Sequence, residues 1–153
     1  MIDEPTIVQT QAQHAACIRV TCSREKIQEV MGPGYMELME ALKAQGVEPA
    51  GPWFTHHLKM DPKVFDFEIC VPVSSPVKPA GRMQTREFPP RKVARTIYRG
   101  GYEGLPDAWG AFDEWIKKNG HKISDDLWEV YTTGPEFGSD SSKWQTELSR
   151  PLK

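Results

Sequence analysis

The feature that most constrains the fold of this chain is an internal repeat. Two segments end in the same pattern, a glutamate followed four residues later by a proline: Glu68-Ile69-Cys70-Val71-Pro72 and Glu147-Leu148-Ser149-Arg150-Pro151. Upstream of each ending, the sequence predicts the order strand, helix, strand, strand, over about 16–72 and 92–152. Because such repeats mark a structural unit that is built more than once, the two halves should fold alike, with Glu68 and Glu147 at equivalent positions.

Residue periodicity supports this order of elements. Phe65, Phe67, Ile69 and Val71 alternate with their neighbours, which is typical of a half-buried strand. The helix expected in the second half has apolar residues spaced three and four apart, which gives it one apolar side. That side comprises Leu105, Ala108, Trp109, Phe112, Trp115 and Ile116. Hairpin-linked strands with helices collected on one face indicate an α+β fold with antiparallel sheets.

Glycines and prolines indicate where elements stop. Gly32-Pro33-Gly34 predicts an interruption of the first helix, with Pro33 opening a second helical segment. The proline-rich stretch 72–81 reads as a linker between the halves. We therefore expect one domain over 1–153, with repeat halves at about 7–73 and 82–152 and pseudo-twofold symmetry between them.

Composition excludes several classes of protein. Nineteen basic and 21 acidic residues give a net charge of −2, and the basic residues are scattered, so direct DNA binding is not expected. The longest apolar runs are far shorter than a membrane helix, and the first residues do not resemble a signal peptide, which favours a cytoplasmic protein. Three cysteines without a Cys-x-x-Cys pattern, and a His56-His57 pair on opposite strand faces, predict neither a metal site nor a cofactor.

The candidate site is the strand that contains Glu129. Trp128 and Val130 should share one face of this strand, and Glu129 and Tyr131 the other. We expect the helix of each half to cover the face that bears Phe54, Phe67, Ile69 or Trp128. The residues expected on the opposite face, lining a central groove, are Thr55, His57, Glu68, Glu129, Tyr131 and Glu147. The alternative to a groove is an exposed sheet face, on which water hydrates the glutamates.

Several segments, in this order and spacing, resemble the GyrI-like small-molecule-binding family, which also forms the effector-binding half of multidrug-sensing transcription regulators. The resemblance runs from about Cys22 to Leu152. The segments are 30–33, 51–54, 65–73, 99–105, Glu129-Val130-Tyr131, and Thr146-Glu147-Leu148 with Pro151-Leu152. It implies a tandem strand-helix-strand-strand fold with a central ligand cleft, in which Glu129 is the acidic residue that faces the ligand.

The leading functional hypothesis is a stand-alone binding protein for hydrophobic molecules that are cationic or aromatic. Glu129 would supply the charge, and the candidates for the aromatic wall are Tyr98, Tyr131, Trp53 and Trp109. Of these, Trp109 lies on the apolar stripe of its helix, which favours a place in the core. The alternative is a hydrolase of cyclopropane-bearing or other reactive natural products, in which Glu129 acts with Glu68 or Glu147 to activate water, as the resemblance implies for some members. A weaker alternative is a protein interaction such as gyrase inhibition or binding to a regulator.

Overall fold

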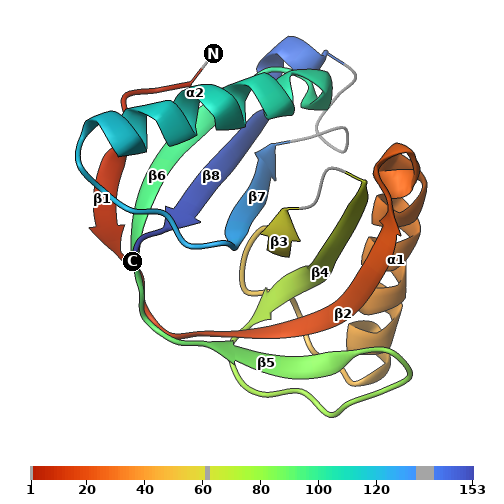
Figure 1. The fold of residues 1–153 in the computed structure, drawn as a ribbon. Helices are drawn as coiled ribbons and strands as arrows, with labels where there is room; N and C mark the ends of the chain where they lie inside the picture. The colour runs from red at the N-terminus through yellow and green to blue at the C-terminus, as the bar shows by residue number, and fades with distance from the viewer. Residues whose placement is uncertain (1, 61–62, 134–139) are drawn as a thin grey trace. The chain divides into compact units, whose positions relative to one another are not determined.

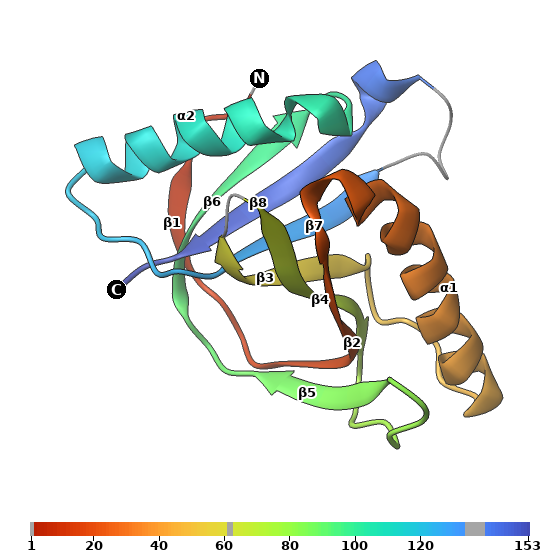
Figure 2. The same ribbon diagram turned by 45° about the vertical axis from the view of Figure 1, so that its right-hand side comes forward.

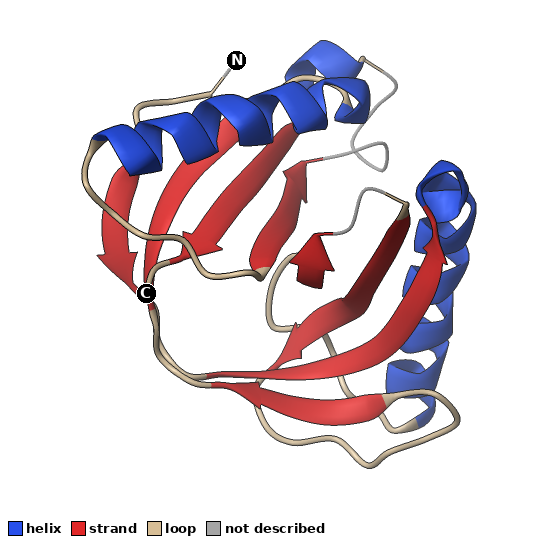
Figure 3. Ribbon diagram, in the orientation of Figure 1, coloured by secondary structure: helices blue, strands red, loops and turns tan. Residues whose placement is uncertain are grey.

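The chain divides into two compact units in the computed structural model, which describes residues 2–60, 63–133 and 140–153. Unit 1 comprises Met1–Thr10 and Arg91–Lys153, and unit 2 comprises Gln11–Pro90. In each unit, one helix packs against one face of an antiparallel sheet (Figures 1 and 3). This arrangement confirms the predicted α+β class.

Unit 2 has the strand order β3-β4-β2-β5. Its elements are β2 (Gln13–Ser23), the 3₁₀ turn η1 (Arg24–Lys26), α1 (Ile27–Ala44), β3 (Phe54–Met60), β4 (Val64–Val73) and β5 (Gln84–Phe88). The core forms where Leu38 and Leu42 of α1 meet Ile18 of β2 and Phe67 and Ile69 of β4. These strand residues alternate with polar ones, so one face of the sheet is apolar and the helix covers it.

Unit 1 has the strand order β1-β6-β8-β7. Its elements are β1 (Thr6–Gln9), β6 (Lys92–Arg99), η2 (Tyr102–Gly104), α2 (Leu105–Lys118), β7 (Leu127–Thr133), a 3₁₀ turn (Ser141–Lys143) and β8 (Gln145–Pro151). The core of unit 1 contains Phe112 and Ile116 of α2 against Leu148 of β8 and Leu127 of β7. Figure 2 shows α2 lying along the sheet of this unit.

Strand pairing confirms the internal repeat. Glu68 lies opposite His56 of β3, and Glu147 lies opposite Val130 of β7. One position further along each chain, Ile69 pairs with Thr55 and Leu148 pairs with Glu129. A register shift follows at the same place in both units, between His57 and Lys59 in one and between Tyr131 and Thr133 in the other. Glu68 and Glu147 therefore occupy corresponding positions, as the repeated ending predicts.

The unit boundaries differ from the expected repeat halves at the edge strands. The chain segment that precedes β2 forms β1, which pairs with β6 in unit 1. Conversely, β5 precedes β6 in the chain but pairs with β2 in unit 2. The halves 7–73 and 82–152 thus each begin with a strand that belongs to the other unit. Strand pairing between distant segments decides this exchange, and residue periodicity carries no information about it.

The expected break at Gly32-Pro33-Gly34 is wrong, because α1 runs without interruption from Ile27 to Ala44. Pro33 removes one backbone N–H from the helix, but the apolar side of α1 remains packed on the sheet. A Cβ on Gly34 would overlap Ile69 Cδ1 and lie 3.3 Å from Ile18 Cδ1. A side chain at this position would therefore have to displace Ile69, because α1 closely approaches the sheet there. Within the described residues, neither helix is long and apolar enough to cross a membrane.

Candidate functional site

The carboxylate of Glu129 is held by two side chains of unit 1. Trp109 Nε1–H of α2 donates a hydrogen bond to Glu129 Oε2 at 2.7 Å, and the Tyr131 hydroxyl donates to Glu129 Oε1 at 2.9 Å. Trp109 and Tyr131 are buried, whereas Glu129 itself is half-buried. Both donors are neutral groups, so they orient the carboxylate without neutralising its charge.

Aromatic rings continue from this carboxylate towards the start of β8. The ring of Tyr102 lies 5.8 Å from that of Tyr131, edge to face, and 5.1 Å from that of Trp144. Tyr102 and Trp144 are half-buried, so the series ends at rings that solvent reaches. We call Glu129 with Tyr102, Trp109, Tyr131 and Trp144 the acidic aromatic site.

The structure corrects the expected orientation of β7. Glu129 and Tyr131 do share a face, as strand alternation predicts, but it is the face covered by α2, because Trp109 of α2 reaches Glu129. Trp128 and Val130 are therefore on the face away from the helix. We expected the more apolar pair to lie in the core. The helix instead provides an N–H donor that satisfies the carboxylate, which offsets the cost of placing Glu129 on this face.

A second layer of polar groups lies behind Trp109. The guanidinium carbon of the buried Arg150 sits 6.0 Å from the Trp109 ring centre, and Arg150 Nε lies 3.8 Å from Asp113 Oδ1 on α2. Burial raises the pKa of Asp113 above its ordinary value, and the positive charges of Arg150 and Lys117 counteract part of this rise. The indole that donates to Glu129 is thus in contact with both an arginine and the ring of Phe112, whose centre lies 5.7 Å away.

Tyr98, which we expected to line the ligand site, makes a hydrogen bond within its own turn. Its hydroxyl donates to the Gly101 carbonyl at 2.7 Å, and a Cβ on Gly104 would overlap that hydroxyl. Gly100 has a φ of 136°, a backbone conformation that residues with a side chain rarely adopt. Gly100 and Gly104 therefore leave room for Tyr98, and Tyr98 stabilises the entry into η2 and α2.

Three further candidates, Trp53, Thr55 and His57, belong to unit 2 and so are not part of the same unit as Glu129. Trp53 packs on Tyr35 of α1, with ring centres 4.7 Å apart. An aromatic contact with the helix of its own unit thus accounts for the position of Trp53.

The orientation of β3 also differs from the expected one. Thr55 lies opposite Ile69 and His57 opposite Phe67, so both are on the helix-covered face and not beside Glu68. Both are buried. Phe54, which we expected under the helix, pairs with Cys70 and lies on the other face. As in β7, polar residues face the helix, here Thr55 and His57, whereas His56 lies on the other face.

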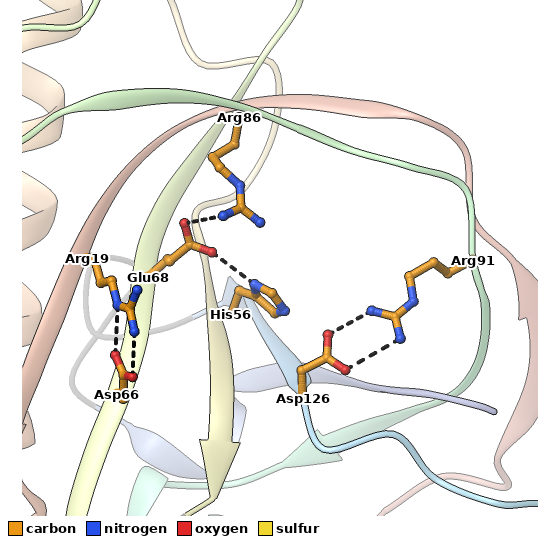
Figure 4. A network of polar contacts seen from close by, with 7 residues as sticks. All are labelled: Arg19, His56, Asp66, Glu68, Arg86, Arg91 and Asp126. Carbon is orange, nitrogen blue, oxygen red and sulfur yellow. Dashed lines mark hydrogen bonds and ion pairs between the residues drawn. The ribbon is translucent and has the colours of Figure 1, made fainter.

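Glu68 is buried and belongs to a polar network on the face of the unit 2 sheet away from α1 (Figure 4). Its Oε1 lies 3.0 Å from His56 Nδ1, and its Oε2 lies 3.1 Å from Arg86 NH1. Arg86 comes from β5 and lies opposite Ala15 of β2, whose small side chain leaves room for the arginine to reach β4. The carboxylate of Glu68 is therefore already engaged by two protein groups. Figure 4 also shows the separate ion pair between Arg19 and Asp66.

The pairs of glutamates proposed for hydrolysis lack support in this arrangement. Glu147 lies opposite Val130 and binds Arg95 Nε at 2.9 Å, on the face away from α2. Glu129 lies on the face towards α2, so the sheet of unit 1 separates these two carboxylates. Glu68 belongs to the other unit. Among the described residues, no group of three or more His, Cys, Asp or Glu is arranged to hold a metal ion.

Sequence reasoning missed two members of the acidic aromatic site, Tyr102 and Trp144, and favoured the core for a third. Trp109 was assigned to the core from its place on the apolar stripe, and it is both a core residue and the donor to Glu129. Tyr102 follows the Gly100-Gly101 turn, and Trp144 immediately precedes β8. The repeat offers a signal for finding them, because Tyr102 and Trp144 stand where the other half has Arg24 and Phe65.

Comparison with solved structures identifies the same fold in known proteins. The crystal structure of the EcmrR C-terminal domain has a TM-score of 0.83 at 21% identity, and the match covers 98% of this chain and 97% of that chain. The EcmrR–DNA complex in EcmrR-RPo has a TM-score of 0.86 at 21% identity, and the match covers 98% of this chain but only 57% of that chain. SAV2435 bound to tetraphenylphosphonium has a TM-score of 0.71 at 14% identity, with 99% of this chain and 94% of that chain covered.

Comparison with curated proteins finds no match. The family model of the GyrI-like small molecule binding domain, in contrast, matches residues 3–153, which is nearly the whole chain. The chain therefore belongs to the GyrI-like small molecule binding domain family.

Proposed function

We propose that this chain binds hydrophobic aromatic cations through the acidic aromatic site of unit 1. The observation that carries the proposal is the Glu129 carboxylate, oriented by Trp109 and Tyr131 and followed by the rings of Tyr102 and Trp144. A carboxylate attracts a cation, and aromatic faces attract both the cation and any rings that it carries. The combination favours a flat or multi-ring cation over an anion of equal size.

The two donors to Glu129 support this role. Because each donor is neutral, the two hold the carboxylate at a defined place without themselves neutralising its negative charge. The half-buried position of Glu129 strengthens the attraction for a cation, since charges interact more strongly when less water separates them. SAV2435, which has a related fold, is bound to tetraphenylphosphonium in its solved structure, and that ion is a cation of the proposed class.

The direct test compares two ions of the same shape and opposite charge, tetraphenylphosphonium and tetraphenylborate, by titration calorimetry. We expect the parent protein to bind the cation more tightly. Glu129→Gln keeps the side-chain volume, so it should keep the fold while lowering affinity for the cation. A lost contact with an ionised group is worth about 1.5–3 kcal/mol, which corresponds to roughly ten- to a hundredfold in affinity.

The matched control is Glu114→Gln, which removes the same charge from an exposed position on α2 of the same unit. This variant should bind tetraphenylphosphonium as the parent does. Equal affinity of the parent for both ions, or an equal fall in the two variants, would show that Glu129 does not determine the ligand. The site would then select for apolar surface alone.

A further inference from the structure

An ion pair in the core of unit 1 lies against the indole of Trp109. Arg150 of β8 is buried, and its guanidinium carbon lies 6.0 Å from the centre of the Trp109 ring. Arg150 Nε lies 3.8 Å from Oδ1 of Asp113 on α2, whose side chain is 27% exposed. The same indole donates its N–H to Glu129. One ring is therefore in contact with the carboxylate of the acidic aromatic site and with a buried arginine.

Strand register places Arg150 on the same face of the sheet as Glu129. Glu129 lies opposite Leu148 in the ladder of β7 and β8, and Arg150 is two residues beyond Leu148 on β8. Side chains two apart on a strand point to the same face, so Arg150 and Glu129 both lie on the face that α2 covers. A fixed positive charge thus lies on the face that the proposed function assigns to cation binding.

The charge of Arg150 opposes the binding of a cation at this face. Like charges repel, and they repel more strongly in a protein interior than in water. Arg150 cannot relieve the repulsion by losing a proton, because a guanidinium stays protonated in proteins. A carboxylate beside it can relieve the repulsion, because a cation then meets a charge pair in place of an isolated positive charge.

Asp113 is placed to supply that carboxylate. Burial raises the pKa of Asp113, and the positive charges of Arg150 and Lys117 counteract part of this rise, so both favour its ionised form. At 3.8 Å, Arg150 Nε and Asp113 Oδ1 are too far apart for a hydrogen bond, and neither atom has another hydrogen-bond partner among the described residues. The two atoms thus interact through charge, and neutral amides at both positions would break no hydrogen bond between them.

We propose that Asp113 determines the charge selectivity of the acidic aromatic site by offsetting the positive charge of Arg150 beside Trp109. The inference rests on the proposed function, the binding of aromatic cations at Glu129. Asp113 does not touch the ligand and acts through Arg150. Without the carboxylate, Arg150 repels cations and attracts anions at the site.

The test measures the affinities for tetraphenylphosphonium and tetraphenylborate by titration calorimetry at mildly alkaline pH. In Asp113→Asn, which is nearly isosteric, affinity for the cation should fall by roughly three- to tenfold and affinity for the anion should rise. A merely structural defect would lower both affinities together. Glu114→Gln removes the same charge from an exposed position next to Asp113 in the chain, and it should leave both affinities as in the parent.

A double variant separates charge from structure. Asp113→Asn combined with Arg150→Gln removes both charges, so the ratio of the two affinities should return towards that of the parent, although both members of the pair are lost. A ratio that stays at the value of Asp113→Asn, or moves further from the parent, would overturn the proposal. The opposite shifts expected in Asp113→Asn alone do not require the double variant to fold.

Failure of this inference differs from failure of the proposed function. The proposed function fails if the parent binds both ions equally and Glu129→Gln has no effect. The present inference fails if the parent prefers the cation and Asp113→Asn keeps that preference unchanged. The NMR signal of the Trp109 indole N–H gives a readout without ligand: it should shift in Asp113→Asn and return towards the parent position in the double variant. An unchanged signal in Asp113→Asn would also overturn the inference.

Discussion

The two units share a backbone plan and differ in what their equivalent positions carry. Glu129 of unit 1 accepts hydrogen bonds from Trp109 and Tyr131, while unit 2 has a buried threonine, Thr55, at the same register position. Counted from the start of each helix, Met31 of α1 corresponds to Trp109 of α2. The indole donor is thus present in the unit that has the carboxylate. The comparison indicates that a charge on the helix-covered face requires a donor from the helix.

The largest expected effect comes from moving the charge into unit 2. Thr55→Glu places a carboxylate on a fully buried site where α1 provides the thioether of Met31 in place of the indole of Trp109. An uncompensated buried charge costs about 3–5 kcal/mol of stability. We therefore expect the free energy of unfolding, measured by urea denaturation, to fall by that amount. Thr6→Glu, at an exposed position of β1, is the control and should be nearly neutral. A stable Thr55→Glu variant would show that unit 2 already has suitable donors.

A smaller effect tests how closely each helix approaches its sheet. Gly34 of α1 corresponds to the fully buried Phe112 of α2, and a Cβ at Gly34 would overlap Ile69 Cδ1. We therefore expect Gly34→Ala to destabilise the protein by about 1–3 kcal/mol, the usual cost of overpacking.

The control for this variant lies two residues earlier on the same helix. A Cβ at Gly32 meets nothing within 4 Å, so Gly32→Ala should gain up to about 1 kcal/mol from helix propensity. Chemical denaturation of the two variants should therefore give changes of opposite sign. Equal changes would mean that the helix of unit 2 moves freely to accommodate a methyl group, and the close approach would not be a constraint.

The smallest expected effect concerns the pair behind Trp109. Burial raises the pKa of Asp113 above its ordinary value. The unfolded chain therefore releases this proton at lower pH than the folded protein does, and the parent loses stability as the pH rises through that interval. Asp113→Asn has no such proton, so its stability relative to the parent should increase between acidic and neutral pH.

Urea unfolding at several pH values checks this trend, with Glu114→Gln at an exposed position of α2 as the control. A relative stability that falls with pH would show that attraction to Arg150 outweighs the burial of Asp113. Counted from the start of each helix, the residue of unit 2 that corresponds to Asp113 is Tyr35, which carries no carboxyl group. This pH dependence therefore belongs to unit 1 and adds a second electrostatic difference between the units.

Much of the fold follows from residue patterns that act locally. The repeated ending at Glu68 and Glu147, the alternation along β4 and the apolar stripe of α2 each predict an element that is present. Alternation also places Glu129 and Tyr131 on one face, in agreement with the hydrogen bond between them. The central cleft, the ligand and any hydrolytic role stay predictions.

Other features were decided by contacts between distant segments. Alternation shows which residues share a face but not which face meets a helix, so the orientation of β7 depended on Trp109, which lies 20 residues away in the chain. The exchange of β1 and β5 depended on pairing with strands far along the chain. Pro33 remains within α1 because packing against the sheet outweighs its local preference to end a helix.

The sequence by itself determined the α+β class, the duplication and the carboxylate on which the proposed function depends. Tertiary structure alone decided that Glu129 lies under α2, that Tyr102 and Trp144 join it, and that Asp113 and Arg150 meet behind Trp109. The physical reason is the range of the interactions. Periodicity and turn chemistry act over a few residues, whereas a site requires side chains from separate elements to meet, and only packing brings them together.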